Sequence, residues 1–378
     1  FDACSFGRFA VSENYEGQVD ATRLSAPGVV DVSINVQLNR STQATIVQAS
    51  LQAVEQKLGL SLPGPFDHVV LIVEECYRVG TDCAFAAYAY VNHWLSLFKG
   101  DNFKYPAVQM HEIGHNLNFA HSGGMDGETY TDHTCLMGNP LFSDDVGKMC
   151  FNPAKTFQIS QGGGGWYDDS HIIEFDSGTW GTTSWSGNII GVAEYNNNPY
   201  NDPVVIKLES GTGRDWFVGF NRAVGSNSDN VEADDSVTIY KVMDGDGLGY
   251  STSSLKGTLR SGQSTAISNW RETGMNLVIE VNEINTKANP GYAHITITFG
   301  GPDQPPPPPV TSFLGLALTL SVIGALCLGA LFYMLCCCTK NSFIENQDII
   351  FVDESYNGES FEENDDDGSV IHVGYAVK

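Results

Sequence analysis

The segment His-Glu-Ile-Gly-His at 111–115, followed by His121, holds the side chains whose types and spacing point most directly to chemistry. If this segment is helical, His111 and His115 lie four residues apart on one face, so both imidazoles can reach one tetrahedral zinc ion. Glu112 is rotated by about 100° from His111, which places its carboxylate beside the metal. A base that acts on a zinc-activated water belongs at that position.

His121 comes too late in the sequence to lie on the same straight helix. We therefore expect the helix to stop and the chain to turn back near Asn118, since Asn tolerates the left-handed conformation that such a stop needs. The alternative is three histidines on an ordinary surface helix. In a chain of this composition, the complete pattern arises by accident roughly once in several thousand sequences, so we favour the zinc site.

The elements around this motif predict an α+β fold. Apolar and polar residues alternate over 30–38, as in a half-buried strand, and 42–58 has one apolar helical stripe that ends at a glycine. The β-branched run 68–73 predicts a central strand, and we expect one further strand over 84–98. Pro106 then begins the helix with the histidines. The prediction is a mixed twisted sheet, backed by one helix, with a second helix that presents the site.

A different composition follows the glycine run 162–165, with short β-rich segments between clusters of Gly, Asn, Asp and Ser. These segments predict a β-sandwich-like domain. They are residues 203–208, 216–221, 236–242, 275–281 and 294–299. The stretch Asp-Gly-Asp-Gly at 244–247 hints at Ca²⁺ but lacks the later acidic ligands of a calcium loop, so we favour a plain surface turn.

The last part of the chain reads as a membrane anchor with a tail. A Pro-rich linker over 301–310 precedes an uncharged apolar segment, 311–335, that is long enough to form a single transmembrane helix. Residues 336–378 are acidic and predict a disordered cytoplasmic tail. Asp303 before the span and Lys340 after it favour a catalytic side that is extracellular or lumenal. We expect the lipid bilayer to be a partner of the chain.

Cysteines and a glycosylation sequon agree with that orientation. Cys76 with Cys83, and Cys135 with Cys150, are plausible local disulfides, although the sequence does not fix the connectivity. Cys4 then remains, either to pair with a cysteine upstream of this chain, which we favour, or as a free thiol. Three cysteines at 336–338 lie where palmitoylation is common, with unmodified thiols as the alternative. Asn39 begins an Asn-Arg-Ser sequon.

The charge of the chain excludes one class of partner. The formal net charge is −26, and no cluster of Lys and Arg offers a nucleic-acid-binding face, so we expect no nucleic acid. The chain begins at Phe1 without Met or an apolar leader, so we expect it to be processed or incomplete.

Several stretches together resemble a known family. They are His-Glu-Ile-Gly-His-Asn-Leu-Asn-Phe-Ala-His at 111–121, Tyr-Thr-Asp-His-Thr-Cys-Leu-Met-Gly at 130–138, Cys-Phe-Asn-Pro-Ala-Lys at 150–155, Gly-Trp-Tyr at 165–167 and Trp-Phe-Val-Gly-Phe-Asn-Arg at 216–222. With these motifs the sequence is similar to the metzincin metallopeptidases, and within them to the gametolysin family of extracellular-matrix and cell-wall lytic proteases. The usual motif has Gly where this chain has Asn118.

The resemblance implies that His111, His115 and His121 bind one Zn²⁺, that Glu112 is the general base and that Met137 forms the methionine turn beneath the metal. It also implies a metzincin-like catalytic domain over 1–180, followed by the β-rich domain at 181–300. His68, His93, His133, His171 and His294 are expected to be structural or exposed, with His133 the best of them as a group that supports the ligands.

Two functions of different classes remain. The first is a membrane-anchored zinc endopeptidase that hydrolyses peptide bonds in protein or glycoprotein substrates of the matrix, cell wall or neighbouring surfaces. The alternative is a catalytically inactive surface receptor or adhesion protein with the same fold. Retention of Glu112 favours the enzyme, because a purely structural zinc site has no use for a base.

Overall fold

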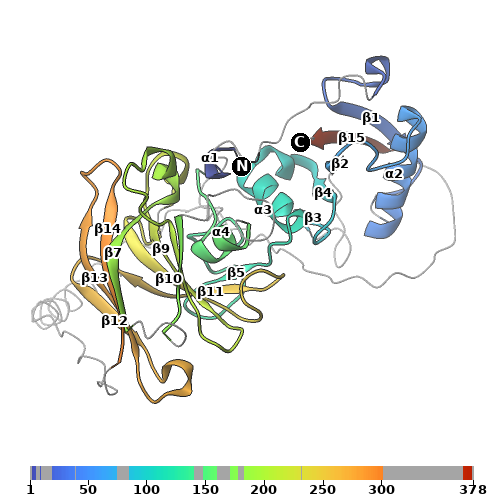
Figure 1. Cartoon of the computed structure of the whole chain (residues 1–378). Coiled ribbons are helices and arrows are strands. Elements are labelled where there is room, and N and C mark those ends of the chain that lie inside the picture. The colour runs from blue at the N-terminus through green and yellow to red at the C-terminus, as the bar shows by residue number, and fades with distance from the viewer. Residues whose placement is uncertain are drawn as a thin grey trace, which may run out of the picture.

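A computed structural model describes most of the chain as two regions, an N-terminal α+β region and a β-rich region (Figure 1). The described residues are 2–5, 9, 19–38, 40–74, 85–139, 148–159, 171–177, 183–230, 232–300 and 369–376.

The N-terminal region is built on a five-stranded sheet with the order β1-β15-β2-β4-β3. β2 and β4 run parallel, whereas β3 is antiparallel to β4, and β15 is antiparallel to both of its neighbours. The mixed sheet that we predicted is therefore present. Its strands are β1 (Val29–Ile34), β2 (His68–Val73), β3 (Ala87–Ala89), β4 (Leu95–Lys99) and β15 (Ser369–Ala376).

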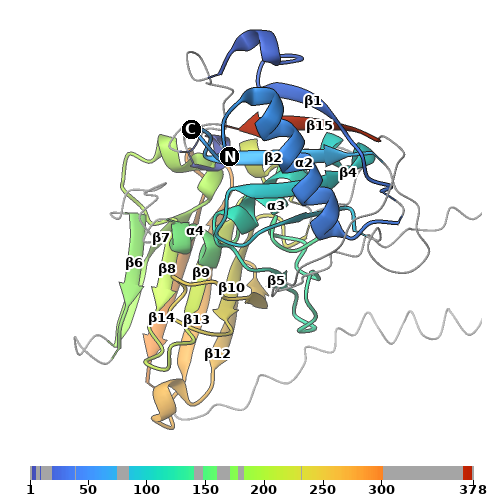
Figure 2. The same cartoon turned by 90° about the vertical axis from the view of Figure 1, so that its right-hand side faces the viewer.

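Two helices cover opposite faces of this sheet (Figure 2). Helix α2 (Gln43–Leu58) packs its buried stripe on the face that includes Val69. Helix α3 (Pro106–Asn116) packs on the face that includes Val70. The prediction for α2 is confirmed: Thr42 caps its first turn, and Gly59 ends it in the left-handed conformation.

The single strand predicted over 84–98 is wrong, because the chain reverses within it. β3 and β4 form an antiparallel hairpin in which the Tyr90 amide donates to the Leu95 carbonyl at 3.0 Å. Asn92 takes the positive φ of 50° that the turn needs. The alternation of Tyr88, Tyr90 and Trp94 continues through the turn, so the sequence pattern hid the reversal.

The β-rich region consists of two sheets that share one apolar core. The six-stranded sheet has the order β5-β11-β10-β9-β8-β6, and the four-stranded sheet has the order β12-β13-β14-β7. The bounds are β5 (Ser122–Gly123), β6 (Ile172–Phe175), β7 (Ser184–Ile190), β8 (Val205–Leu208), β9 (Trp216–Asn221), β10 (Ser236–Val242), β11 (Ser253–Leu259), β12 (Gln263–Ile267), β13 (Leu277–Asn285) and β14 (Tyr292–Phe299).

Short helices complete the described chain. They are α1 (Asp2–Ser5), α4 (Pro153–Ile159) and the 3-10 turns η1 (Ala21–Arg23), η2 (Gly100–Lys104), η5 (Val192–Asn197), η6 (Gly225–Asn227) and η7 (Trp270–Glu272).

The six-stranded sheet draws strands from both sides of residue 180. β5 pairs in parallel with β11, and β6 pairs in parallel with β8. The segment directly after His121 is therefore hydrogen-bonded into the same sheet as residues beyond 250. The two predicted domains, which meet at residue 180, therefore both contribute strands to the six-stranded sheet.

Residues 369–376 differ from the prediction that the whole tail 336–378 is disordered. They form β15, which inserts between β1 and β2. The segment includes Val370, Ile371 and Val373, whose β-branched side chains favour a strand, but the acidic composition of the tail masked this signal.

No helix in the described part of the chain is both long and apolar enough to cross a membrane. The linker 301–310 and the predicted transmembrane segment 311–335 lie outside the described residues, as do Asn39, Cys76, Cys83 and the cysteines at 336–338.

The disulfide predicted between Cys135 and Cys150 is wrong, and so is the expectation that Cys4 has no partner in this chain. Cys4 bonds to Cys150, while Cys135 is a buried free thiol. The sulfur of Cys135 accepts hydrogen bonds from the amides of Met137 and Asn152. The Cys4 pairing spans 146 residues, which spacing in the sequence does not reveal.

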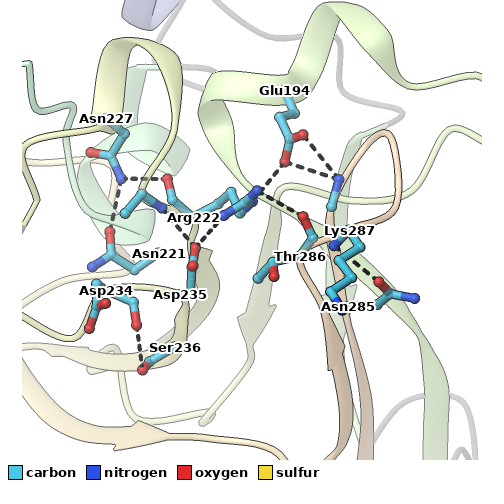
Figure 3. Close-up of polar contacts among 12 residues, drawn as sticks. Glu194, Asn221, Arg222, Asn227, Asp234, Asp235, Ser236, Asn285, Thr286 and Lys287 are labelled. Carbon is cyan, nitrogen blue, oxygen red and sulfur yellow. Dashed lines mark hydrogen bonds and ion pairs between the residues drawn. The ribbon is translucent and has the colours of Figure 1, made fainter.

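An ion-pair network around Arg222 fastens loops of the β-rich region to one another (Figure 3). The guanidinium contacts Asp235 at 2.6 Å and Glu194 at 3.4 Å, and it donates to the Thr286 carbonyl at 3.1 Å. The side chain of Arg222 is only 13% exposed, so water would replace its interactions with the two carboxylates poorly if this cation were removed.

Replacement of Arg222 by Met should lower the free energy of unfolding by about 3 kcal/mol, because two partly buried carboxylates lose their shared cation. Urea unfolding followed by circular dichroism measures this change. The control is Arg260→Met, since the Arg260 pair with Asp234 is more than half exposed. That substitution should cost less than about 1 kcal/mol, and equal costs for the two variants would contradict the assignment.

Candidate metal centre

Helix α3 presents the first two histidines as the sequence predicted. It begins at Pro106, and its ring contacts place the imidazoles of His111 and His115 next to each other, with centroids 4.9 Å apart. Both side chains are buried, as is His121. Burial of three histidines in one place argues against the surface-helix alternative.

The chain reverses at Asn118, also as predicted. Asn118 has a φ of 71°, and its amide donates to the His115 carbonyl at 2.9 Å. The amide of Phe119 donates to the Gly114 carbonyl, and the Gln158 side chain holds the Asn118 carbonyl at 2.7 Å. This turn returns the chain along α3 and delivers His121 to the first two histidines.

The three side chains converge on one point, and their potential ligand atoms all lie within 4.8 Å of one another. Nε2 of His121 lies 3.0 Å from Nε2 of His115. Within the described residues, this triad is the only group of three or more His, Cys, Asp or Glu side chains that is arranged to hold a metal ion.

Backbone carbonyls fix the tautomers of two of these imidazoles. Nδ1 of His111 lies 2.7 Å from the Leu136 carbonyl, and Nδ1 of His115 lies 2.7 Å from the Phe119 carbonyl. A carbonyl oxygen can only accept, so each Nδ1 has the proton and each Nε2 presents a lone pair. This donor set fits Zn²⁺, which takes neutral imidazole nitrogens in tetrahedral sites.

The surroundings keep the imidazoles neutral. Burial, together with the neighbouring His115, lowers the pKa of His111 to about 3. Burial and the other two histidines lower the pKa of His121 to about 2. Proton competition for these ligands is therefore weak at neutral pH, which favours metal binding.

Glu112 is the one acidic side chain in the motif. It is 1% exposed, and its Oε2 has no hydrogen-bond partner among the described residues. Burial raises the pKa of this carboxyl to about 8. A buried carboxyl oxygen that has no hydrogen-bond partner among the described residues, on the residue next to a ligand histidine, is typical of a functional group rather than of a structural one.

Met137 lies against the ligand helix at Gly114, between the two helical histidines. A Cβ at Gly114 would lie 2.4 Å from the sulfur of Met137, so only glycine allows this close approach. Met137 is completely buried. Its position beneath α3 fits the role that the resemblance implies.

Comparison with known proteins identifies the region around this site. Residues 1–170 match the family model of the gametolysin peptidase M11. This part of the chain is similar to the gametolysin-like peptidases. No curated protein and no solved structure matched the chain in the corresponding searches. The family and the buried triad together support a metallopeptidase with a site compatible with zinc.

The gametolysin-like site includes an aromatic residue that we did not single out from the sequence. The ring of Tyr130 lies 4.1 Å from that of His121 and is stacked on His111 at 6.2 Å. Tyr130 also has a φ of 70°, which is rare for a bulky side chain. Two signals were available in the sequence, its place nine residues after a ligand and its position at the start of the motif 130–138.

His133, the histidine that we favoured as a supporting group, helps to hold the turn that includes Met137. Its Nδ1 contacts the Asn139 carbonyl at 2.9 Å, and its amide donates to Glu232.

The Asp-Gly-Asp-Gly stretch at 244–247 forms a turn in which the carboxylates of Asp244 and Asp246 accept hydrogen bonds from nearby backbone amides. The described residues give no support for Ca²⁺ there.

Substitution of Asn118 tests the turn that completes the gametolysin-like triad. Asn118→Val should lower the free energy of unfolding by about 1–2 kcal/mol and weaken zinc binding, because a β-branched residue resists the left-handed conformation. Asn118→Gly should retain both properties. Urea unfolding and competition with a chromophoric chelator measure them.

Asn201 provides the matched control, since it is an exposed Asn with a φ of 53° in the β-rich region. Asn201→Val should lower stability in a similar way without any change in zinc affinity. Zinc binding by Asn118→Val equal to that of the wild type would contradict the importance of this turn.

Proposed function

We propose that the protein is a zinc-dependent endopeptidase of the metzincin type, with His111, His115 and His121 as metal ligands and Glu112 as the general base. The supporting observation is the convergence of the three histidines, together with the buried Glu112, whose Oε2 has no hydrogen-bond partner among the described residues. A metal site with only a structural role would gain nothing from an acid placed in this way.

The proposed reaction divides the work between the ion and Glu112. When bound, zinc would supply a Lewis acid that activates water and polarises the peptide carbonyl. Glu112 would take a proton from the attacking water while the new carbon–oxygen bond forms. It would pass that proton to the amine nitrogen when the carbon–nitrogen bond breaks. The nearby cation would favour the carboxylate form that Glu112 needs as a base, against the effect of its burial.

We propose that an extended substrate pairs with β3. This strand is an edge of its sheet among the described residues, with β4 as its neighbour. The Asn116 side chain donates to the Tyr90 and Leu95 carbonyls, and the Asn92 amide donates to His115, so the hairpin is fastened to the ligand helix. A peptide added to this edge would run beside the ligands.

We further propose that the catalytic region faces the cell exterior or a secretory lumen, and that segment 311–335 anchors it in a membrane. The Cys4–Cys150 disulfide supports an oxidising compartment. Proteins of the matrix, the cell wall or nearby surfaces are then the proposed substrates.

The first test replaces Glu112 by Gln, which keeps the shape of the side chain but removes the base. Peptidase activity on a denatured protein substrate should fall by about 10²–10⁴-fold, because general-base catalysis contributes on this order. Zinc content should remain one ion per chain. Activity of the wild type should disappear with a chelator and return with zinc.

Equal activity of Glu112→Gln and the wild type would overturn the mechanism. A wild-type protein that contains one zinc ion but cleaves no protein mixture would instead support the inactive receptor.

The second test concerns the anchor. A single span would place residues 369–376 across the membrane from β1 and β2, so the membrane-inserted form would have that sheet without β15. We expect an epitope tag added after Lys378 to bind its antibody only after cells are permeabilised. A tag at the N-terminal end provides the exposed control. Binding to the C-terminal tag on intact cells would contradict the single span.

A further inference from the structure

Asp132 lies at the centre of a buried hydrogen-bond network next to the metal centre. Its carboxylate accepts from the Ser122 hydroxyl at 2.5 Å and from the Thr134 amide at 2.9 Å and hydroxyl at 2.7 Å. The Tyr240 hydroxyl lies 3.0 Å and 3.1 Å from its two oxygens. These partners are neutral, so the buried charge of Asp132 depends on the full set of donors.

The network fixes the turn 132–139, which lies under the ligand helix. The Asn139 amide donates to the Asp132 carbonyl at 3.1 Å, and a Cβ at Gly138 would lie only 1.8 Å from that oxygen. The two ends of the turn, Asp132 and Asn139, are thus hydrogen-bonded to each other. It includes Leu136, whose carbonyl orients His111.

The same turn also holds the strand that follows the third ligand. The Ser122 amide donates to the Met137 carbonyl at 2.8 Å, and the Ser122 hydroxyl donates to Asp132. Two of the three histidines are therefore positioned through groups that Asp132 anchors. His115 is the exception, since it is oriented by Phe119 within its own turn.

The β-rich region supplies the remaining part of the network. Tyr240 belongs to β10 and is completely buried, and Ser253 of β11 contacts the Ser122 hydroxyl at 3.0 Å. The Asn152 side chain donates to both serine hydroxyls, while the Ser253 amide donates to the His121 carbonyl at 3.2 Å. Burial raises the pKa of the Tyr240 phenol well above its usual 10, and the charge of Asp132 adds to this effect. The hydroxyl therefore stays protonated and remains a donor.

We infer that Tyr240 is a positioning residue for the metal centre. The β-rich region then contributes to the geometry of the site. Through Asp132, its hydroxyl fixes the Leu136 carbonyl that orients His111 and the strand that follows His121. The inference rests on the proposed function in that it concerns the same zinc site. Tyr240 lies outside the part of the chain that matches the peptidase family.

The test uses the full chain with Tyr240→Phe, which removes one hydroxyl and keeps the ring in its core. Tyr292→Phe is the matched control, because Tyr292 packs against the same apolar cluster and its hydroxyl makes no hydrogen bond among the described residues. Asp132→Asn is a second variant, in which an amide donor would face other donors.

Two readouts separate positioning from simple stability. The zinc dissociation constant is measured by competition with a chromophoric chelator, under conditions where circular dichroism shows each variant to be folded. The visible spectrum of the cobalt-substituted protein reports the geometry of the ligands. Tyr240→Phe should weaken zinc binding about 10–100-fold, as loss of groups that support ligands commonly does, and should shift the cobalt bands. Tyr292→Phe should change neither.

A folded Tyr240→Phe protein with the zinc affinity and cobalt spectrum of the wild type would overturn the inference, even if its unfolding temperature fell. If Asp132→Asn does not fold, the Tyr240 variant decides the matter alone. Both readouts concern metal binding, so a wild type that binds zinc without peptidase activity would contradict the proposed function and leave this inference standing.

Discussion

The metal centre depends on two hydrogen bonds from imidazole rings to backbone carbonyls, those of Leu136 and Phe119. Each bond fixes the proton on Nδ1, so Nε2 of His111 and of His115 faces the common point with a lone pair. The Phe119 carbonyl is local, because it belongs to the turn at Asn118. The Leu136 carbonyl is not, since its position depends on a turn that a buried carboxylate holds together. Much of the surrounding structure keeps that turn in place.

This dependence explains why the β-rich region is packed so closely on the site. β5 extends the ligand-bearing chain directly into the six-stranded sheet, where it pairs with β11. The disulfide from Cys4 ends at Cys150, whose carbonyl in turn accepts from the Leu136 amide at 3.4 Å. Covalent, backbone and side-chain links thus meet at the segment under α3. Such links should increase the resistance of this segment to local opening.

The sequence predicted those parts of the protein whose geometry is local. The helix from Pro106 and the stop at Asn118 follow from spacing and from the preferences of single residues, so the triad could be predicted from His111, His115 and His121 alone. The helix over 42–58 followed from its stripe and its cap for the same reason. Met137 needed the family resemblance, because one buried methionine has no distinctive pattern.

Long-range pairing could not be predicted in this way. The partners Cys4 and Cys150, β15 and its two neighbours, and Asp132 and Tyr240 are each brought together only by the packing of the complete fold. The prediction of a single strand over 84–98 failed for a different reason, because the alternation of aromatic residues continues through the turn at Asn92. The assignment of the two domains at residue 180 stays a prediction, and the shared sheet shows why sequence composition alone is a weak guide to it.

We propose that one zinc ion binds to three imidazole nitrogens at this site. X-ray absorption at the zinc edge of the purified full chain, with the metal content determined in the same sample, tests it most directly. We expect one zinc ion per chain with three imidazole nitrogens at about 2.0–2.1 Å and no sulfur ligand. Replacement of His121 by Ala should remove one of the three imidazole contributions. A sulfur-containing shell, or a zinc signal unchanged by that substitution, would contradict this set of ligands.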